Sequence, residues 1–268
     1  MTPAQRPTYN ETQIQESQYE FPYHYIPLVR NGKFFHARYW AWSYRYLGGI
    51  HLLLTILSRV SFGSLIDIGC GDGRFLREVA SSFPATRLLG VDVSERAIAF
   101  AQVFNPQIAY QRLDILEEEI PARFDVATLV EVIEHVPPPS LPSFMSAVAR
   151  TLEDEGTLIL TAPHVNVPVT KKHFQHFDSQ KLRSLLEPSF EIQEFIPFDV
   201  RPACSRLMWL LDSLLGPKGN LVLLRNGRLL NGLYNLYLRK FLIAKSESEC
   251  ERIAVVARKR AVVSKQRS

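Results

Sequence analysis

Three glycines separated by single residues follow a short apolar run in this chain, in the string LIDIGCGDG over residues 65–73. Glycine has no Cβ, so such a loop can turn tightly and let its backbone approach a ligand closely. The apolar run predicts a strand, and the helical spacing of RFLREVASSF directly after the loop predicts a helix. A strand that leads through a glycine loop into a helix is typical of α/β domains.

The same alternation of strand and helix patterns continues along the chain. Further strands are predicted over RLLGVDV, IAYQRLDI, FDVATLV, GTLILTA, FEIQEFIPF and ERIAVVARK. Helices are predicted over SERAIAFAQVF with Ser94 as N-cap, over LPSFMSAVARTL with Ser140 as N-cap, and near SQKLRSLL. We therefore predict an α/β, Rossmann-like, doubly wound and mainly parallel seven-stranded sheet, with ligands at the carboxyl ends of its strands.

Two segments lie outside this alternation and suggest how the chain is divided. A helix-like run from about His36 to Val60 precedes the first strand, and Gly48 and Gly49 are expected to break it. The runs SRLMWLLDSLL and LLNGLYNLYLRKFL predict helices in an insertion before the last strand. We expect an N-terminal extension over residues 1–60, a Rossmann-like domain over 61–199 with 250–262, a helical insertion over 200–249 and a disordered tail over 263–268.

The composition is that of an ordinary globular protein and excludes disorder for most of the chain. Of its 268 residues, 46% are hydrophobic and 22% are charged. The apolar stretches over 46–57 and 207–215 are shorter than the about 20 residues that a membrane-spanning helix needs. The first residues lack the apolar core of a signal peptide. The three cysteines are far apart and odd in number, which argues against a disulfide framework. We expect a cytoplasmic protein.

Positive charge is concentrated near the C-terminus, where residues 201–268 hold 14 Lys and Arg against four acidic residues. One interpretation is that helices of the insertion pack on the core and leave a solvated basic rim. Another is a basic amphipathic surface for anionic lipid or a lipid-linked substrate. Large aliphatic side chains, rather than stacking aromatic ones, accompany the charges, so we expect no nucleic-acid partner.

The spacing of the loop distinguishes between two classes of ligand. A dinucleotide site uses G-x-G-x-x-G and rests a pyrophosphate on a helix N-terminus. Here the spacing is G-x-G-x-G, and Asp67 stands two residues before the first glycine. A carboxylate there would repel a pyrophosphate, but it would suit a ligand that carries an ammonium or sulfonium charge.

The string DIGCGDG resembles the first motif of the class I S-adenosylmethionine-dependent methyltransferases. Further landmarks follow in register: Asp92 in GVDVS, Asp114 in RLDI, FDVATLVEVIEHV at the fourth strand and GTLILTAP at the fifth. The resemblance implies S-adenosyl-L-methionine as cofactor, with Asp92 on the ribose hydroxyls and Asp114, beside Ile115, on the adenine amino group. The full set of expected cofactor-binding residues is Asp67, Gly69, Cys70, Gly71, Gly73, Asp92, Val93, Asp114, Ile115 and Glu131.

Acidic and histidine residues follow the fourth and fifth strands. Glu131, Glu134 and His135 come first, and KKHFQHF, with His176, comes later. If the first segment is helical, Glu131 and His135 are neighbours one turn apart. His135 or His176 could act as a general base, all four residues could hold a divalent metal, or the cluster could be structural or orient the substrate.

We expect Glu131, His135 and His176 to be catalytic and expect no bound metal. The pattern E-x-x-E-H…H is similar to that of small-RNA 3′-terminal 2′-O-methyltransferases and of ubiquinone-biosynthesis O-methyltransferases. Cys70 is expected to be a small packing residue rather than a nucleophile.

The whole chain, including YEFPYHYIP and KKHFQHF, looks like bacterial methyltransferases associated with cell-surface glycan or lipid-linked sugar synthesis. These resemblances imply O-methylation of a glycan, a lipid-linked sugar or a quinone-like small molecule, with peripheral contact to the inner face of an anionic membrane through residues 200–249. The alternatives are a metal-dependent RNA ribose 2′-O-methyltransferase and a non-catalytic scaffold that binds S-adenosylmethionine.

Overall fold

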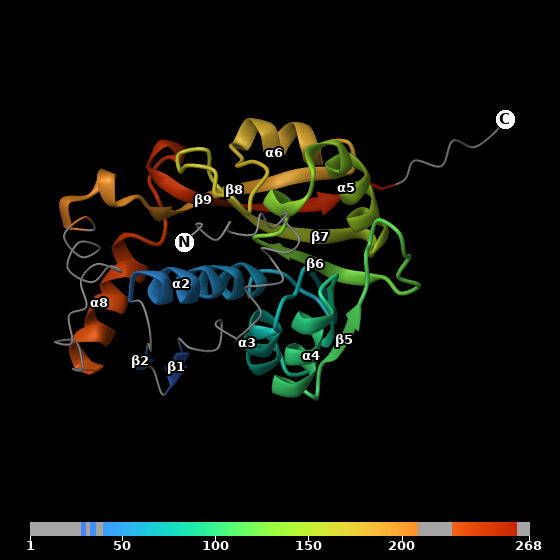
Figure 1. Cartoon of the computed structure of the whole chain (residues 1–268), viewed down its shortest axis with the longest axis horizontal. Coiled ribbons are helices and arrows are strands. Elements are labelled where there is room, and N and C mark those ends of the chain that lie inside the picture. The colour runs from blue at the N-terminus through green and yellow to red at the C-terminus, as the bar shows by residue number, and fades with distance from the viewer. Residues whose placement is uncertain (1–27, 31–32, 36–39, 208, 210–226, 262–268) are drawn as a thin grey trace, which may run out of the picture.

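The computed structural model describes residues 28–30, 33–35, 40–207, 209 and 227–261. Its main sheet has seven strands in the order β5-β4-β3-β6-β7-β9-β8 (Figure 1). The strands are β3 (Ser64–Ile68), β4 (Arg87–Asp92), β5 (Ala109–Arg112), β6 (Phe124–Val130), β7 (Leu152–Pro163), β8 (Phe190–Val200) and β9 (Cys250–Lys259). Strands β3 to β7 pair in parallel, and β9 lies antiparallel between β7 and β8. The predicted mainly parallel, Rossmann-like fold is confirmed.

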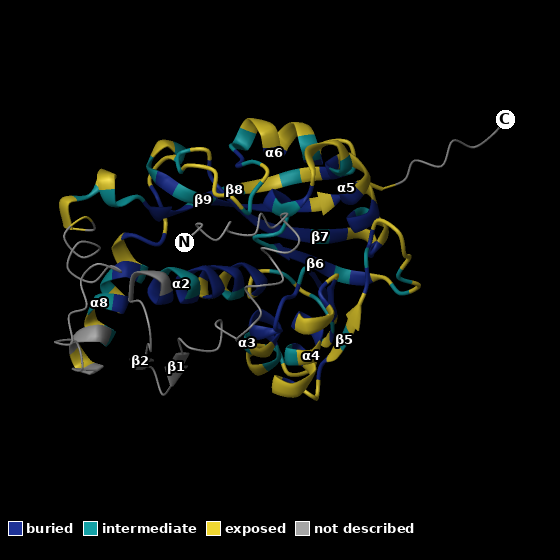
Figure 2. Cartoon of the chain, in the orientation of Figure 1, coloured by how far each residue is buried: buried dark blue, intermediate teal, exposed yellow. Residues whose placement is uncertain are grey.

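Helices cover both faces of this sheet. One group consists of α2 (Trp40–Leu57), α3 (Arg74–Ser82), α4 (Glu95–Phe104) and α8 (Gly227–Lys240), and the other of α5 (Leu141–Arg150) and α6 (Ser179–Leu186). Each group closes its own hydrophobic core, and neighbouring strand residues alternate between the two, as Leu65 and Ile66 do. Figure 2 shows the central strands buried between these layers, whereas the edge strand β5 and the outer sides of α4 and α6 are exposed.

Short elements complete the described chain. The strands β1 (Leu28–Arg30) and β2 (Lys33–Phe35) pair antiparallel with each other. Four 3-10 turns lie in the connections: η2 (Ile133–His135), η3 (Pro138–Ser140), η4 (Pro202–Cys204) and η6 (Glu247–Glu249). Within the described residues no helix is long and apolar enough to cross a membrane.

The two predicted N-caps behave differently. Ser94 accepts a hydrogen bond from the Ala97 amide at 3.1 Å and caps α4 as predicted. Ser140 makes no side-chain capping bond, so that prediction is wrong. Its backbone is already helical at the end of η3, so its hydroxyl does not have the geometry of an N-cap. The helix that follows ends at Arg150, and Leu152 already pairs with Phe124 in the sheet.

The expected break at Gly48 and Gly49 is also wrong, because α2 continues through both residues. A Cβ on Gly48 would lie 2.5 Å from Cε1 of Tyr237 on α8, and a Cβ on Gly49 would lie 3.1 Å from Nη1 of Arg252. The glycines therefore allow α2 to approach α8 and the sheet closely. This packing outweighs their low helix propensity.

The proposed division of the chain stays a prediction. Residues 1–27 of the expected N-terminal extension, most of SRLMWLLDSLL and the expected tail lie outside the described residues. The second predicted helix of the insertion corresponds to α8. Strand β9 brings the chain back into the sheet after this insertion.

Candidate functional site

A cavity of about 580 Å³ lies at the carboxyl ends of the parallel strands. This volume is within the range of small-molecule and cofactor sites. The cavity brings together most of the residues that the sequence singled out. Those that line it are Asp67, Gly69, Cys70, Gly71, Asp92, Val93, Asp114, Ile115, Glu131, Glu134 and His135.

The glycine loop after β3 has a conformation that favours glycine. Gly69, Gly71 and Gly73 have φ values of 75°, 56° and 77°. A Cβ on Gly69 would lie 2.6 Å from Cγ2 of Val132, so a side chain there would also clash. Gly73 is not among the residues that line the cavity, and its role at the cofactor stays a prediction. It precedes α3 as its N-cap residue, where a Cβ would meet the Tyr110 hydroxyl at 2.5 Å.

Asp92, at the end of β4, holds the loop in place. Its Oδ2 accepts a hydrogen bond from the Gly71 amide and its Oδ1 accepts one from the Ser94 amide, both at 2.9 Å. A carboxylate offers about four lone-pair sites. Asp92 can therefore hold the loop and still accept hydrogen bonds from a ligand with neighbouring hydroxyls.

Asp67 is a buried carboxyl group in the floor of the cavity. Burial raises its pKa to about 7, although a 2.6 Å hydrogen bond from the Thr128 hydroxyl opposes the shift, and the charge of Asp92 adds to it. A positively charged ligand would stabilise its ionised form. This carboxyl therefore suits the cationic ligand that the sequence predicts.

Four other expected cofactor residues, Asp114, Ile115, Val93 and Cys70, also line the cavity. Asp114 is half-buried and accepts a hydrogen bond from the Leu116 amide at 2.9 Å, Ile115 is buried and Val93 is exposed. The Cys70 thiol is buried, and burial together with the charges of Asp92, Asp67 and Asp72 raises its pKa well above the ordinary value. A thiol held protonated is a poor nucleophile.

Glu131 stands at a bend rather than on a helix. Its φ is 57°, and its amide donates to the Thr161 carbonyl at 3.1 Å. Helical geometry begins only at η2, so the condition for a one-turn spacing of Glu131 and His135 is not met. Burial raises the pKa of the Glu131 carboxyl, while the positive charge of Arg252 opposes the shift. Its Oε1 has no hydrogen-bond partner among the described residues.

His135 presents one ring nitrogen toward Glu134. Its Nδ1 lies 2.8 Å from the Lys172 carbonyl oxygen. A carbonyl only accepts, so Nδ1 carries the proton and Nε2 of the neutral ring has a lone pair. This Nε2 is 3.9 Å from Oε1 of Glu134, which is 1% exposed. Burial lowers the pKa of His135, and burial with the negative charge of Glu131 raises that of Glu134 well above its ordinary value.

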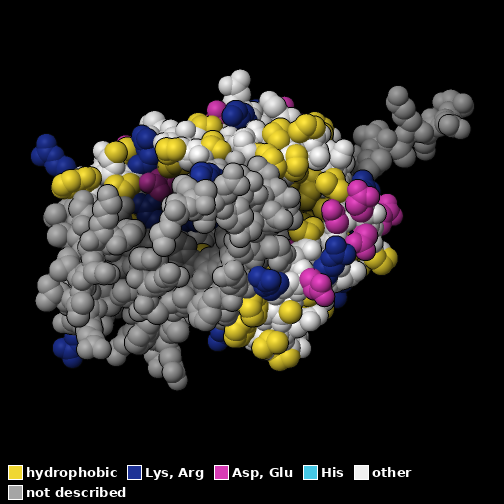
Figure 3. Space-filling view, viewed as in Figure 1, with side chains coloured by type: hydrophobic (Ala, Val, Ile, Leu, Met, Phe, Trp, Pro, Cys, Tyr) yellow, Lys and Arg dark blue, Asp and Glu magenta, His cyan; other side chains and the backbone are white. Residues whose placement is uncertain are grey.

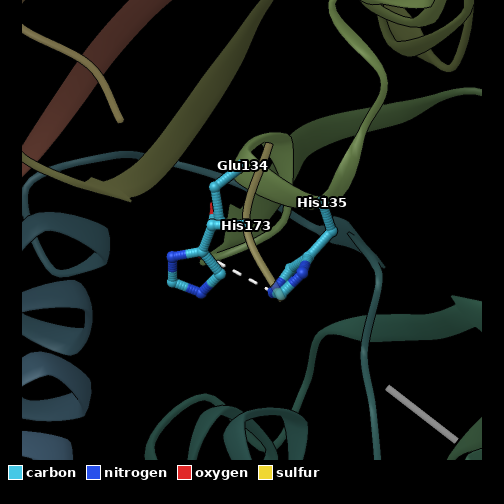
Figure 4. Close-up of side chains that lie close together, drawn as sticks. All are labelled: Glu134, His135 and His173. Carbon is cyan, nitrogen blue, oxygen red and sulfur yellow. Dashed lines mark ion pairs between the residues drawn. The ribbon is translucent and has the colours of Figure 1, made fainter. Parts of the chain in front are cut away.

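His173, rather than His176, lines the cavity, and a catalytic role of His176 stays a prediction. His176 is buried behind it, with Nε2 2.8 Å from Nδ1 of His173 and Nδ1 2.9 Å from the Val167 carbonyl oxygen. Figure 4 shows the rings of His173 and His135 side by side near Glu134. His164 does not line the cavity either. Its Nε2 lies 2.9 Å from Oε1 of Glu247.

Sequence analysis did not identify three charged residues that also line the cavity, Arg45, Asp199 and Arg252. Asp199, at the end of β8, has a φ of 63° and accepts a hydrogen bond from the Tyr237 hydroxyl at 3.1 Å. Its Oδ2 lies 3.4 Å from Nη1 of Arg45 on α2 and 3.3 Å from Nε of Arg252 on β9. Arg45 also forms an ion pair with Glu251. These residues are far apart in sequence and share no motif, so only the fold brings them together.

Comparison with known proteins gives concordant results. Residues 39–210, more than half of the chain, match the family described as "Methyltransferase domain". A ubiquinone biosynthesis O-methyltransferase of Leptothrix cholodnii is 30% identical over 109 residues, which are 38% of this chain and 45% of that protein. The chain thus spans less than half the length of the curated relatives it matches.

Two solved structures share the fold. The N-methyltransferase NodS of Bradyrhizobium japonicum, in complex with S-adenosyl-L-homocysteine, has a TM-score of 0.58 and 16% identity, with 94% of this chain and 99% of that chain covered. A SAM-dependent methyltransferase of Archaeoglobus fulgidus has a TM-score of 0.54 and 19% identity, with 80% and 94% covered.

Proposed function

We propose that this chain, which belongs to the class I S-adenosylmethionine-dependent methyltransferases, transfers a methyl group to an oxygen atom of a small-molecule acceptor. S-adenosyl-L-methionine is the cofactor of this family. The observation that carries the proposal is a single cavity with buried carboxyl groups at one end and the Nε2 lone pair of His135 at the other. This arrangement would hold a cation and an acceptor hydroxyl in one enclosed space.

The residues at the first end fit the cofactor. Gly69 and Gly71 have positive φ values that would be strained in a residue with a Cβ, and they let the loop approach the cofactor closely. Asp92 has lone pairs for two ribose hydroxyls, and the carboxyl of Asp67 suits a positive charge. When bound, S-adenosylmethionine supplies the methyl group from its sulfonium, which becomes a neutral thioether as the carbon–sulfur bond breaks. The chain binds and orients both partners, and Nε2 of His135 takes the hydroxyl proton as the oxygen–carbon bond forms.

The walls near the second end favour an acceptor with an apolar ring or chain. Tyr46, Ile50 and Leu53 of α2 line the cavity, together with Phe198 of β8. Among a glycan, a lipid-linked sugar and a quinone-like molecule, these side chains favour the quinone-like acceptor. The similarity to the O-methyltransferases of ubiquinone biosynthesis supports the same choice.

The test is methyl transfer from labelled S-adenosylmethionine to a panel of catechols, lipid-linked sugars and free sugars, with the His135→Ala variant as control. We expect the catechols to be methylated, and His135→Ala to lower turnover about 100-fold or more while cofactor affinity is retained. Cofactor binding without turnover on any acceptor would support the non-catalytic scaffold instead. Methylation of RNA, but not of small molecules, would support the RNA ribose methyltransferase.

We propose in addition that the segment around η4 contacts anionic lipid. Leu207 and Trp209 are 44% and 59% exposed, and the exposed Arg206 lies between η4 and these residues. Figure 3 shows apolar side chains beside a basic one at the left edge, where this segment reaches the surface. Sedimentation with neutral and anionic liposomes over a salt series tests this: we expect salt-sensitive binding to the anionic vesicles alone. Absence of binding at low salt would exclude the contact.

A further inference from the structure

Arg252 on β9 has hydrogen-bond donors that the described residues do not use. Its Nη2 donates to the Arg45 carbonyl at 2.8 Å, and its Nε lies 3.3 Å from Oδ2 of Asp199. The guanidinium carbon lies 4.5 Å from the centre of the Phe198 ring. Nη1 lies beside Gly49, where a Cβ would be 3.1 Å away, and it donates to no described residue. Because Gly49, Phe198 and Arg252 line the cavity, a ligand there can take up the N–H groups of Nη1.

Glu131 offers the opposite kind of group to the same cavity. Its carboxyl lines the cavity, and its Oε1 accepts no hydrogen bond from the described residues. Arg252 is close enough for its charge to oppose the rise in the pKa of Glu131, yet no ion pair joins the two in the part of the chain that the structure describes. A buried donor and a buried acceptor that do not meet both cost free energy unless a ligand satisfies them.

A hydroxyl is the group that suits both partners, because one oxygen atom can accept from Arg252 and donate to Glu131. A carboxylate could accept from Arg252, but it has no hydrogen for Glu131, and the negative charges of Glu131 and Asp199 would repel it. An ammonium group could donate to Glu131, but the positive charges of Arg252 and Arg45 would repel it. The pair therefore selects a neutral group that is donor and acceptor at once.

We propose that Arg252 and Glu131 bind a second hydroxyl of the methyl acceptor and thereby make a diol the preferred acceptor. This inference rests on the proposed function, in which Nε2 of His135 takes the proton of the hydroxyl that is methylated. Glu134 lies close to both places. Its Oε1 is 3.9 Å from Nε2 of His135, and the charge of Glu131 raises its pKa. The apolar walls of the cavity favour an aromatic diol among the possible diols.

The same pair limits the chain to one methylation of each diol. In the first transfer an oxygen–carbon bond replaces the O–H bond, the proton goes to His135, and the sulfonium becomes a neutral thioether. For a second transfer the methoxy oxygen must lie between Arg252 and Glu131. It can accept from Arg252, but it has no hydrogen to donate to Glu131. The product instead binds with its remaining hydroxyl in that place and its ether oxygen at His135, which is unproductive.

The experiment compares catechol, phenol and benzoate as ligands of the full chain with S-adenosylhomocysteine bound. Their Kd values are measured by NMR titration. We expect catechol to bind about 10-fold more tightly than phenol or better, because phenol leaves Arg252 and Glu131 without a partner. Benzoate should bind no more tightly than phenol. Equal Kd values for catechol and phenol, or tighter binding of benzoate than of catechol, would overturn the proposal.

Arg252→Lys keeps the positive charge beside Asp199 but lacks Nη1, so it should reduce the preference for catechol about fivefold or more. Glu131→Met keeps a side chain of similar length without the acceptor, and it provides a second test if the first variant does not fold. Arg258→Lys is the matched control on the same strand. Its side chain pairs with the exposed Glu155 outside the cavity, so the preference should not change. A preference that survives in both Arg252→Lys and Glu131→Met would contradict the proposed pair.

Mass spectrometry of the products gives a separate reading. With excess S-adenosylmethionine, catechol should gain one methyl group, and 2-methoxyphenol should gain none. Dimethylated catechol would exclude the limit to one methylation. A preference for catechol that depends on Arg252, without turnover of any acceptor, would leave the diol site intact and reject the proposed methyl transfer. Methylation of phenol as fast as of catechol would reject the diol site and leave the methyl transfer intact.

Discussion

The two ends of the cavity are built in different ways. At the cofactor end, consecutive strands end in a glycine loop and in acidic residues, and Asp92 accepts hydrogen bonds from the Gly71 amide of that loop and from the Ser94 amide before α4. At the other end, which we propose binds the acceptor and call the acceptor end, Asp199 interacts with side chains from α2, α8 and β9. A site built from consecutive strand ends can be recognised in the sequence. A site built from four distant segments depends on the finished fold.

The two ends of the cavity also differ in how their buried charged groups interact. The cofactor end places carboxyl groups where burial and mutual repulsion oppose ionisation, and the raised pKa of Asp67 is the result. At the acceptor end, Asp199 is paired with both Arg45 and Arg252, although burial raises the pKa of Glu131 and of Glu134 there as well. We therefore expect changes at the first end to act through charge and cofactor binding, and changes at the second to act on stability with little effect on the cofactor.

The largest effect is expected for Asp67→Asn without cofactor. In the pH window between the ordinary value of 3.8 and about 7, the folded chain keeps more protons on Asp67 than the unfolded chain does, so its stability falls as pH rises. The variant lacks this penalty, and above pH 7 it should gain up to about 4 kcal/mol in the free energy of unfolding relative to the wild type. Urea unfolding at pH 5 and pH 8 measures the difference.

Asp125→Asn is the control for this prediction. Burial alone would raise the pKa of Asp125, but hydrogen bonds from Gly63 and Ser64 hold it below the ordinary value. Its contribution to stability is therefore present above the ordinary pKa and lost as pH falls. An Asp67→Asn difference that does not change with pH would contradict our account of the cofactor end.

Gly69→Ala should weaken cofactor binding by about 3 kcal/mol, because the alanine must adopt a positive φ and its Cβ must displace Val132. Calorimetric titration with S-adenosylhomocysteine measures the loss. Gly232→Ala on α8, where a Cβ meets nothing within 4 Å, is the matched control and should bind normally. Equal affinities in the two variants would show that the loop tolerates side chains.

Asp92→Ala should weaken S-adenosylmethionine binding by roughly 1.5–3 kcal/mol, because it removes the expected acceptors for two ribose hydroxyls. It also removes the acceptor for the amides of Gly71 and Ser94. Comparison with a 2′-deoxyribose analogue of the cofactor separates the two contributions. If the wild type does not discriminate against the analogue, the ribose assignment fails.

The smallest effect is expected for Tyr237→Phe at the acceptor end. The ring stays against Gly48, but the hydrogen bond to Asp199 is lost, which should lower the free energy of unfolding by about 1 kcal/mol. Affinity for S-adenosylhomocysteine should stay within twofold. A large loss of cofactor affinity would show that the two ends are coupled and that our comparison is too simple.

The sequence predicted the sheet and the positions of Asp67, Gly69, Asp92 and Asp114 because strand periodicity and loop spacing are local signals. It selected His176, whereas His173 lines the cavity. They stand three residues apart in a loop, where no period tells which side chain faces the cavity. The positive φ of Glu131 gave no signal either, because glutamate is not a residue that marks such a bend.

Strand β9 is the latest of the seven strands in the chain, yet it lies inside the sheet between β7 and β8. A nascent chain leaves the ribosome from its N-terminus. The glycine loop and its acidic partners can therefore assemble while β8 still lacks β9, its neighbour in the sheet. Arg252 arrives with β9 itself. During synthesis, the half that we propose binds the cofactor can form first, and the half that we propose binds the acceptor is completed only when β9 is inserted.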